Sequence, residues 1–462
     1  MRQPIILEIL ALLVIQVLTV TSVKAVSCDE TIGRRVAKAD GSANYAGVKP
    51  GNTVCIAAGN RGKLTLVNFK GTETAPIAFI NSGGEVRIDA SNGEAGIKLY
   101  GSQHVRISGT GTKDTQYGIR ISNATNGGVI TNHAGARGAL DGTEYIELDH
   151  LEIYGVQSGI RSGQNKNAAP GTWAGHGYHI HDNYVHDMLN GTGEAMYIGS
   201  SAKSGLEPIH DVHIHHNRIV NAGWDAIQVR QGHTSVQVHD NTIHTTGIDP
   251  RKHKTIDNTA GLNIAQGSDT GDWYNNIIIN ARKGAHVKDV KNVRIFNNLF
   301  IDCGHVATWN PTPDHPSGAT PVEGTIELIA VDNVKVFNNT IINRTLVSAY
   351  GISIGKQENK NGMIQDNIIA GSVGTAIRGR DGFAINNNLI LSSIDQVGFV
   401  NPANDDYHLT GSSHAVDRGN NSDAPTFDLD NVARPQGVKS DLGAYEYKPV
   451  GGDPSIQTSI EK

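Results

Sequence analysis

The sequence predicts an all-β protein that folds as a single-domain, right-handed parallel β-helix, a solenoid of stacked coils. An asparagine-centred motif occurs eight times between residues 181 and 390, at spacings of 21 to 41 residues. Such spacings indicate one basic unit with insertions in some copies. A short β-branched run follows the motif, as at Ile277–Ile279, and runs of this kind favour strands and are too short for helices.

The eight motifs share a central asparagine and an apolar residue two positions later. Stacked on successive coils, these asparagines would hydrogen-bond along the axis and satisfy backbone groups at one bend. A β-propeller or a β-sandwich would have no such ladder, so both folds are disfavoured. The asparagines are Asn183, Asn217, Asn241, Asn276, Asn298, Asn339, Asn367 and Asn388.

Residues before each asparagine alternate between apolar and polar, as in Val236–His239. This alternation places one side of a strand inside the coil and the other outside. Glycine, asparagine and aspartate separate the strands, and these residues tolerate positive φ at turns. We therefore expect two or three short strands in each coil.

The N-terminus has the pattern of a secretory signal. Arg2 precedes an apolar run from residue 9 to 20, and Val23-Lys24-Ala25 offers a small-residue cleavage site. We expect residues 1–25 to be removed and the protein to be secreted, with an uncleaved anchor as the weaker alternative. Cys28 would then either pair with Cys55, leaving Cys303 over, or carry a lipid.

Composition agrees with one long, turn-rich domain. The chain has 462 residues, 54 of them glycine, and only 18% are charged. The net charge of −6 argues against nucleic acid as a partner. A negative net charge is still compatible with a local basic cleft, because charges can be distributed unevenly over the surface. We expect a monomer without a membrane span.

The β-helix is expected over residues 27–447, in three parts. Residues 27–90 should form an N-terminal cap and residues 91–392 the coils. Residues 393–447 lack the repeat and should close the end of the solenoid, as terminal repeats must. Residues 448–462 are a polar tail.

A second repeat lies out of phase with the asparagines, with a small residue, an aliphatic residue, a variable residue and then an aliphatic residue or glycine. Because the aliphatic residues should point inward, the variable residues should form an external column. That column contains Arg161, Tyr197, Gln228, Asn263, His286, Glu327, Ser353 and Arg378. A parallel column contains Arg230, Lys288 and Arg380.

Two acids precede the small residue on successive coils, Glu194 and Asp225. Coils stack at roughly 4.8 Å, so we expect the two carboxylates about 5 Å apart. A merely solvated face would carry mostly threonine, serine, asparagine and lysine. We therefore expect a cleft that binds a linear sugar chain, with stacking and polar contacts from Tyr197, Trp224, Arg161, Gln228, Asn263, Arg378 and Arg380.

Several segments resemble secreted bacterial proteins of the pectate-lyase-like β-helix superfamily. They are the asparagine coils, the Pro50–Thr53 turn, and the closing segments Asp406–Leu409 and Asp441–Glu446. The likeness covers nearly all of the chain after the signal. It is specific for fold and less so for reaction, because the superfamily includes lyases, glycoside hydrolases, epimerases and phage adhesins.

Among those proteins, the likeness to chondroitinase-B-like and alginate lyases implies β-elimination on an acidic polysaccharide. It implies Lys288 as the base and Arg230 as the group that neutralises the uronic carboxylate. It also implies calcium, held by Glu194, Asp225 and Asn263, since calcium prefers hard oxygen donors.

The residues themselves leave other functions open. His286 and Tyr197 are rival bases. Glu194 and Asp225 could instead serve a retaining glycoside hydrolase, for which a separation near 5 Å is suitable. A uronate epimerase or a non-catalytic glycan-binding protein would also suit the pattern.

Histidines are concentrated in two coils. His-x-His spacing can bind zinc, but these residues flank turns of the repeat, so stacking along the axis is the expected role. They are His176, His179, His181, His186, His210, His213, His215 and His216.

Overall fold

The computed structural model describes residues 27–132, 142–163, 175–188, 193–199, 208–247, 259–265, 267–304 and 324–449, without the side chains of residues 345–349. The predicted signal and residues 450–462 of the tail lie outside the described residues. Within the described ranges, no helix is long and apolar enough to cross a membrane.

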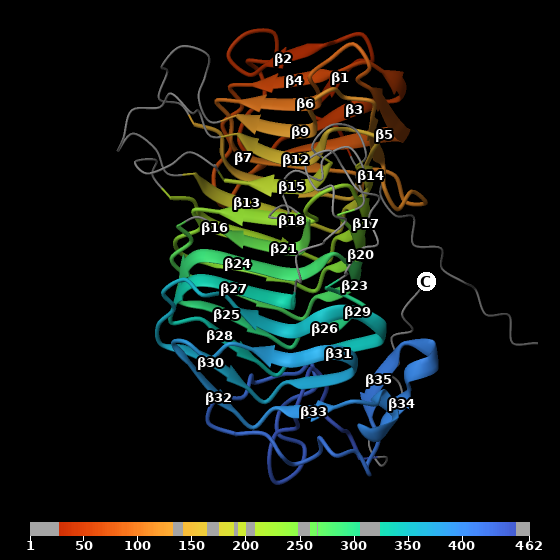
Figure 1. Ribbon diagram of the computed structural model, residues 1–462. Coiled ribbons are helices and arrows are strands. Elements are labelled where there is room, and N and C mark those ends of the chain that lie inside the picture. Colours follow the sequence, from red (N-terminus) through yellow and green to blue (C-terminus); the bar gives the residue numbers. More distant parts are fainter. Residues whose placement is uncertain are drawn as a thin grey trace, which may run out of the picture.

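The chain forms the predicted right-handed parallel β-helix (Figure 1). Within the described residues, thirty-three strands belong to one continuous parallel network, and each coil pairs with the next along the axis. The strands lie in three stacks, which we call A, B and C. A coil passes from stack A through the asparagine bend to stack B and then to stack C.

Stack A contains β1 (Glu30–Ile32), β3 (Thr53–Arg61), β5 (Ile77–Asp89), β7 (Gln103–Ser108), β10 (Glu144–Asp149), β13 (His176–His181), β16 (His210–His215), β19 (Val236–His239), β22 (Gly271–Tyr274), β25 (Val293–Phe296), β28 (Lys335–Phe337), β30 (Gly362–Gln365) and β32 (Phe383–Asn386). Stack B contains the ends of β3 and β5, β8 (Ile119–Ser122), β11 (Leu151–Tyr154), β14 (Tyr184–Met188), β17 (Arg218–Ala222), β20 (Thr242–Thr246), β23 (Ile277–Ala281), β26 (Leu299–Ile301), β29 (Thr340–Ile354), β31 (Ile368–Arg378) and β33 (Leu389–Leu391). Stack C contains β2 (Lys38–Asp40), β4 (Leu64–Val67), β6 (Ala95–Tyr100), β9 (Gly127–Asn132), β12 (Ser158–Gly163), β15 (Glu194–Ile198), β18 (Ile227–Arg230), β21 (Ala260–Ala265), β24 (Lys283–Lys291), β27 (Gly324–Asp332) and the ends of β29 and β31. The strands of residues 27–90 therefore pair in the same stacks as the later coils.

The asparagine ladder runs unbroken through all eight copies. Each side-chain amide donates to the next asparagine's Oδ1, at 2.9–3.0 Å from Asn183 to Asn388. The same Oδ1 accepts the backbone N–H of the preceding asparagine, as Asn217 does from Asn183 at 3.1 Å. The ladder thus satisfies buried backbone groups at the bend.

The residue before each asparagine adopts left-handed backbone geometry. φ is 53° at Asp182, 52° at Asp240 and 50° at Asn338. Aspartate, asparagine and histidine adopt this region more readily than other residues with a side chain. The Asp-Asn, His-Asn and Asn-Asn pairs of the motif therefore encode the bend itself.

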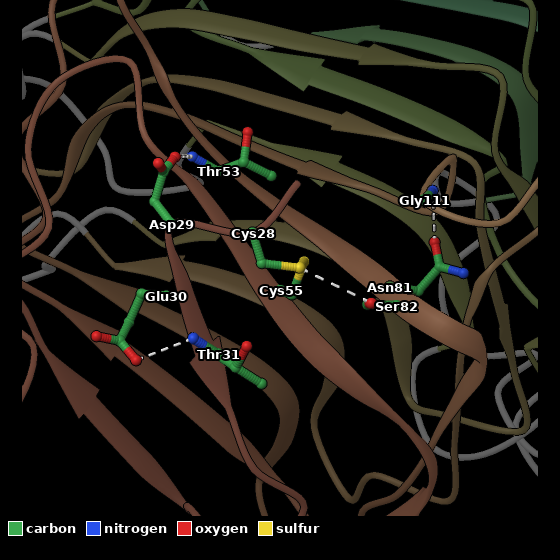
Figure 2. The surroundings of a disulfide bond; sticks show 9 residues. All are labelled: Cys28, Asp29, Glu30, Thr31, Thr53, Cys55, Asn81, Ser82 and Gly111. Atoms are coloured by element: carbon green, nitrogen blue, oxygen red, sulfur yellow. Dashed lines mark hydrogen bonds between the residues drawn. A yellow bond between two sulfur atoms is a disulfide. The ribbon is translucent and has the colours of Figure 1, made fainter. Parts of the chain in front are cut away.

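The first coils are tied by a disulfide between Cys28 and Cys55 (Figure 2). The Asp29 carboxylate lies beside this bond and accepts the Thr53 N–H at 2.7 Å. Of the two alternatives for Cys28, the structure shows the pairing with Cys55. Cys303 is a buried free thiol.

The C-terminal segment packs beside the last coils (Figure 1). It comprises a turn of 3-10 helix, η1 (Ile394–Gln396), the antiparallel pair β34 (Phe399–Asn401) and β35 (Asp406–Leu409), a second turn, η2 (Pro402–Asn404), and the irregular chain that follows. Its apolar residues, including Tyr407 and Tyr445, form a second core with Leu299, Ile301 and Ile342 of stack B.

Candidate functional site

Stack C places the predicted column on neighbouring strands in one continuous register. The order is Arg161, Tyr197, Gln228, Asn263, His286, Glu327, Ser353, Arg378. Arg230 and Lys288 lie in the parallel column, two coils apart, with Ala265 between them. The centre of both columns lies on five strands of stack C, which are β15, β18, β21, β24 and β27 (Figure 1).

The centre of the column is buried, which differs from the expected external strip. Gln228, Asn263 and His286 are only 0%, 1% and 2% exposed. β18 and β21 are buried on both faces, whereas a strand such as β11 alternates between buried and half-buried residues. The alternation of apolar and variable residues predicts that the variable side chains point out of the coil, but it does not predict that they reach solvent.

Glu194, Gln228 and Arg230 form a hydrogen-bonded chain across two coils. In the orientation that satisfies both neighbours, the Gln228 amide nitrogen donates to Glu194 Oε1 at 3.1 Å. Its oxygen then accepts from Arg230 Nε and Nη2, both at 2.6 Å. Gln228 thereby holds the Arg230 guanidinium in a fixed position.

Asp225 is fully buried beside this chain. Its carboxylate accepts the Ala260 N–H and the Asn263 side-chain amide, both at 2.7 Å. Burial raises the pKa of Asp225 to about 6, although these hydrogen bonds and the charges of Arg230 and Lys283 oppose the rise. A hydrogen bond from Ala195 N–H to the Asp225 carbonyl, at 3.1 Å, places Glu194 and Asp225 on adjacent coils as expected.

Lys283 is a further member of the cluster, and the sequence reasoning missed it. Its ammonium is 2.8 Å from Glu327 Oε2, which also lies 2.8 Å from His286 Nδ1. Burial alone would raise the pKa of Glu327, but His286 and Lys283 outweigh it and lower the pKa to about 2. Lys283 precedes Gly284 just as Glu194 and Asp225 precede their small residues, so the same signal could have identified it.

Tyr197 lies between two arginines at one side of the buried cluster. The Arg161 and Arg230 guanidinium carbons are 5.5 Å and 5.9 Å from the centre of its ring. Such distances suit cation–π contacts. Tyr197, Trp224, Arg161 and Lys288 are each partly exposed, so these side chains are accessible to a ligand.

Arg378 and Arg380 are not brought into the cluster. Both are exposed, and Arg378 lies three coils beyond His286 in the register. At roughly 4.8 Å per coil, that is about 14 Å away. The Arg378 guanidinium instead lies 4.8 Å from the centre of the Tyr350 ring.

The three predicted calcium ligands make hydrogen bonds with protein groups. Both Asp225 oxygens accept N–H groups, and Asn263 directs its NH₂ group at that carboxylate. A calcium ion needs oxygen atoms at these positions, and in this arrangement Asn263 presents its NH₂ group to Asp225 in place of an oxygen. Acidic and histidine groups that could hold a metal lie on stack A: His179 with Asp211 and His213, and Glu147 with Asp149 and His181.

Comparison with known proteins gives distant structural likenesses. The chain is similar to a pectate lyase, Pel9A, at 12% identity over 92% of this chain and 98% of that one, with a TM-score of 0.49. It is similar to an alginate lyase from Paenibacillus sp. str. FPU-7, at 14% identity over 78% and 99%, with a TM-score of 0.40. A mannuronan C-5 epimerase module from Azotobacter vinelandii matches at 14% identity over 78% and 100%, with a TM-score of 0.37. No model of a protein family matches the chain, and no curated protein matches it.

Proposed function

We propose that stack C carries the active site of a polysaccharide lyase, which cleaves a uronic-acid-containing polysaccharide by β-elimination. The observation that carries the proposal is the pairing of columns: Arg230 and Lys288 lie two coils apart in one column, beside Tyr197 in the other. A cation that holds the carboxylate and a base that takes the neighbouring proton are what this reaction requires.

Arg230 suits the binding of a uronic carboxylate. Arg230 is 8% exposed, and Gln228 fixes its guanidinium through Nε and Nη2. A carboxylate that binds through two parallel hydrogen bonds would therefore have to use the edge formed by the two Nη groups. As the proton leaves the carbon next to the carboxylate, negative charge grows on the carboxylate oxygens. A preorganised guanidinium stabilises that charge more than it stabilises the bound substrate.

Lys288 is the proposed base. Its amine would take the proton from the carbon next to the carboxylate, and a C=C bond would form as the glycosidic C–O bond on the following carbon breaks. The departing oxygen would keep the bonding electrons and take up a proton from water. Tyr197 is one rival, because its hydroxyl group belongs to a partly exposed ring beside Arg230. His286, the other rival, is buried and pairs with Glu327. The proposal uses no calcium ion at Glu194, Asp225 and Asn263, because Asp225 already accepts hydrogen bonds from Ala260 and Asn263, and Glu194 accepts one from Gln228.

A glycoside hydrolase is the second candidate, and one observation favours it. The pKa of Asp225 is raised to about 6 by burial, which is typical of a carboxyl group that acts as a general acid. Asp225 accepts two hydrogen bonds from the protein, however, and its side chain has no exposed surface. Proton donation to a substrate would require this carboxyl to become accessible.

The test is incubation of the protein with a panel of uronic-acid polymers. Elimination generates an unsaturated uronate, so ultraviolet absorbance should rise together with new reducing ends. New reducing ends without that absorbance would show hydrolysis. A change in uronate configuration without cleavage would show epimerisation, and either outcome would refute the lyase.

We also propose that the protein is secreted, because the Cys28–Cys55 disulfide suits an oxidising compartment. N-terminal sequencing of the protein from the culture medium should begin at residue 26. Retention of the full chain in the cytoplasm would contradict this proposal.

A further inference from the structure

Stack A carries a second cluster of ionisable side chains, separate from the strands of the proposed active site. His179 on β13 and His213 on β16 are neighbours in register, with ring centres 4.8 Å apart. The carboxylate of Asp211 lies between them, with Oδ2 3.5 Å from His179 Nε2 and Oδ1 3.1 Å from His213 Nε2. All three side chains reach solvent, with exposed fractions of 47%, 41% and 27% for His179, Asp211 and His213.

These separations match the edge of a tetrahedral metal site. With metal–ligand bonds of about 2.0–2.1 Å, neighbouring ligand atoms in a tetrahedron lie about 3.3 Å apart. The distances from Asp211 to its two histidines lie on either side of that value, each measured from a different carboxylate oxygen. One ligand atom from each residue lies within 4.8 Å of the others. Two imidazoles and one carboxylate suit zinc and related transition metals better than calcium or magnesium.

A neighbouring group on stack A has similar residue types, but its acids already pair with an arginine side chain. Glu147 and Asp149 lie with His181 on adjacent strands of the same stack. The Arg106 Nε is 2.7 Å from Asp149 and 3.1 Å from Glu147, so a guanidinium already neutralises these acids. Asp211 pairs with two histidines instead, and both can bind a metal in their neutral form.

A hollow of about 490 Å³ adjoins the second cluster, and His179, Asp211, Glu147 and Tyr145 are among the residues that line it. Three protein ligands leave one position of a tetrahedral ion open, which is the arrangement of zinc sites that bind a further ligand. The hollow has room for such a ligand.

We propose that His179, Asp211 and His213 bind a transition-metal ion of the zinc type, with an open coordination position that faces this hollow. The site is independent of the proposed lyase reaction, since none of its residues belongs to stack C.

The experiment is calorimetric titration of the full, chelator-stripped protein with Zn²⁺, together with the visible absorption of the Co²⁺ form. We expect one ion per chain and the strong d–d absorption of four-coordinate Co²⁺. His213→Gln and Asp211→Asn should each weaken Zn²⁺ binding by at least about 100-fold, because loss of a direct ligand should cost no less than loss of an outer-shell partner. Asparagine suits position 211 because φ there is 55°.

Glu73→Gln is the matched control, since Glu73 is an exposed carboxylate that lines the same hollow and belongs to neither candidate metal group. It should leave the Zn²⁺ affinity unchanged, and circular dichroism should show that every variant is folded. Absence of Zn²⁺ binding would overturn the proposal. So would binding that both ligand variants retain, or an equal loss in the Glu73→Gln control.

Discussion

Asp225, Lys283 and Glu327 bring two carboxylates and one ammonium into the interior of stack C. An isolated buried charge is costly, and pairing with hydrogen bonds is what makes such burial tolerable. Lys283 pairs with Glu327 at 2.8 Å, and its charge partly opposes the rise that burial causes in the pKa of Asp225. The cluster is therefore a fixed electrostatic support beneath Arg230 and Tyr197.

Replacement of Lys288 tests its role as the base. We expect Lys288→Ala to lower kcat/KM for elimination by about 10²-fold to 10⁴-fold, the usual contribution of a general base. Stability should change little, because Lys288 is half-buried. The measurement is ultraviolet absorbance of the unsaturated product.

Lys291→Ala on the same strand is the control, since Lys291 is exposed and lies 3.8 Å from Asp269. It should keep native activity. Full activity of Lys288→Ala would reject the assignment and would direct attention to Tyr197.

Asp225 should make stability depend on pH. Its pKa in the folded protein is raised to about 6, so its stabilising contribution is complete below about pH 4 and declines as the pH rises through 6. Relative to Asp225→Asn, native protein should lose about 2 kcal/mol of unfolding free energy between about pH 4.5 and 7.5. Urea unfolding of both proteins at these two values measures the difference.

Glu327 does not interfere in that window, because its pKa is lowered to about 2 and its stabilising contribution is lost only as the pH falls below about 4.5. A constant difference between native protein and Asp225→Asn across the window would contradict a raised pKa.

The asparagine ladder is the element that sets the phase of the coils. Asn276, in the middle of the ladder, donates to the Val238, Tyr274 and Asn298 oxygens, and its Oδ1 accepts from Asn241. Three of these four hydrogen bonds join Asn276 to a neighbouring coil, and the one to Tyr274 lies within its own coil. Loss of one member therefore leaves buried partners on two coils without hydrogen bonds.

Position along the ladder should determine the cost of losing an asparagine. We expect Asn276→Ala to lower the unfolding free energy by about 3 kcal/mol or more, because several buried groups lose partners. Asn388→Ala should cost about 1 kcal/mol, because Asn388 ends the ladder and is only half-buried. Urea unfolding measures both, and equal losses would argue against a cooperative ladder.

The first and last coils of the described chain are stabilised by different means. At the N-terminal end the Cys28–Cys55 bond closes a segment with a sequence separation of 27 and joins β1 to β3. At the C-terminal end, residues of 393–447 cover the apolar outer side of β26, β29 and β31. The buried pair of Arg434 and Glu446, 3.0 Å apart, holds that covering segment together.

Reduction of the disulfide should loosen the first coils only. Closing a loop of this length contributes about 3–4 kcal/mol in the chain-entropy model. We expect faster hydrogen exchange in β1 and β3 after reduction, with β21 unchanged as the internal control. Uniform acceleration along the chain would show instead that the solenoid unfolds as one unit.

Thiol alkylation reports whether reduction is selective. Burial raises the pKa of the Cys303 thiol to about 12, so it should stay unreactive in the folded protein. Mass spectrometry should therefore find two alkylated cysteines after reduction and none before.

Sequence by itself determined the fold, the phase of the coils and the register of the columns. Each follows from local rules: asparagine and aspartate at the bend, alternation along each strand, and a repeat that copies both. The order from Arg161 to Arg378 follows once Asn183 and its seven counterparts are aligned. A repeat fixes neighbours along the axis because each coil contacts only the next.

Only the tertiary structure decided which members of the column are buried and how they pair. The alternation of apolar and variable residues predicts the side of a strand on which Gln228 or His286 lies. It does not predict what packs against that side. Lys283 with Glu327, and Asp211 with His179 and His213, depend on side-chain conformations that span two coils. Burial and charge pairing are properties of the assembled solenoid, and no single coil of the sequence contains them.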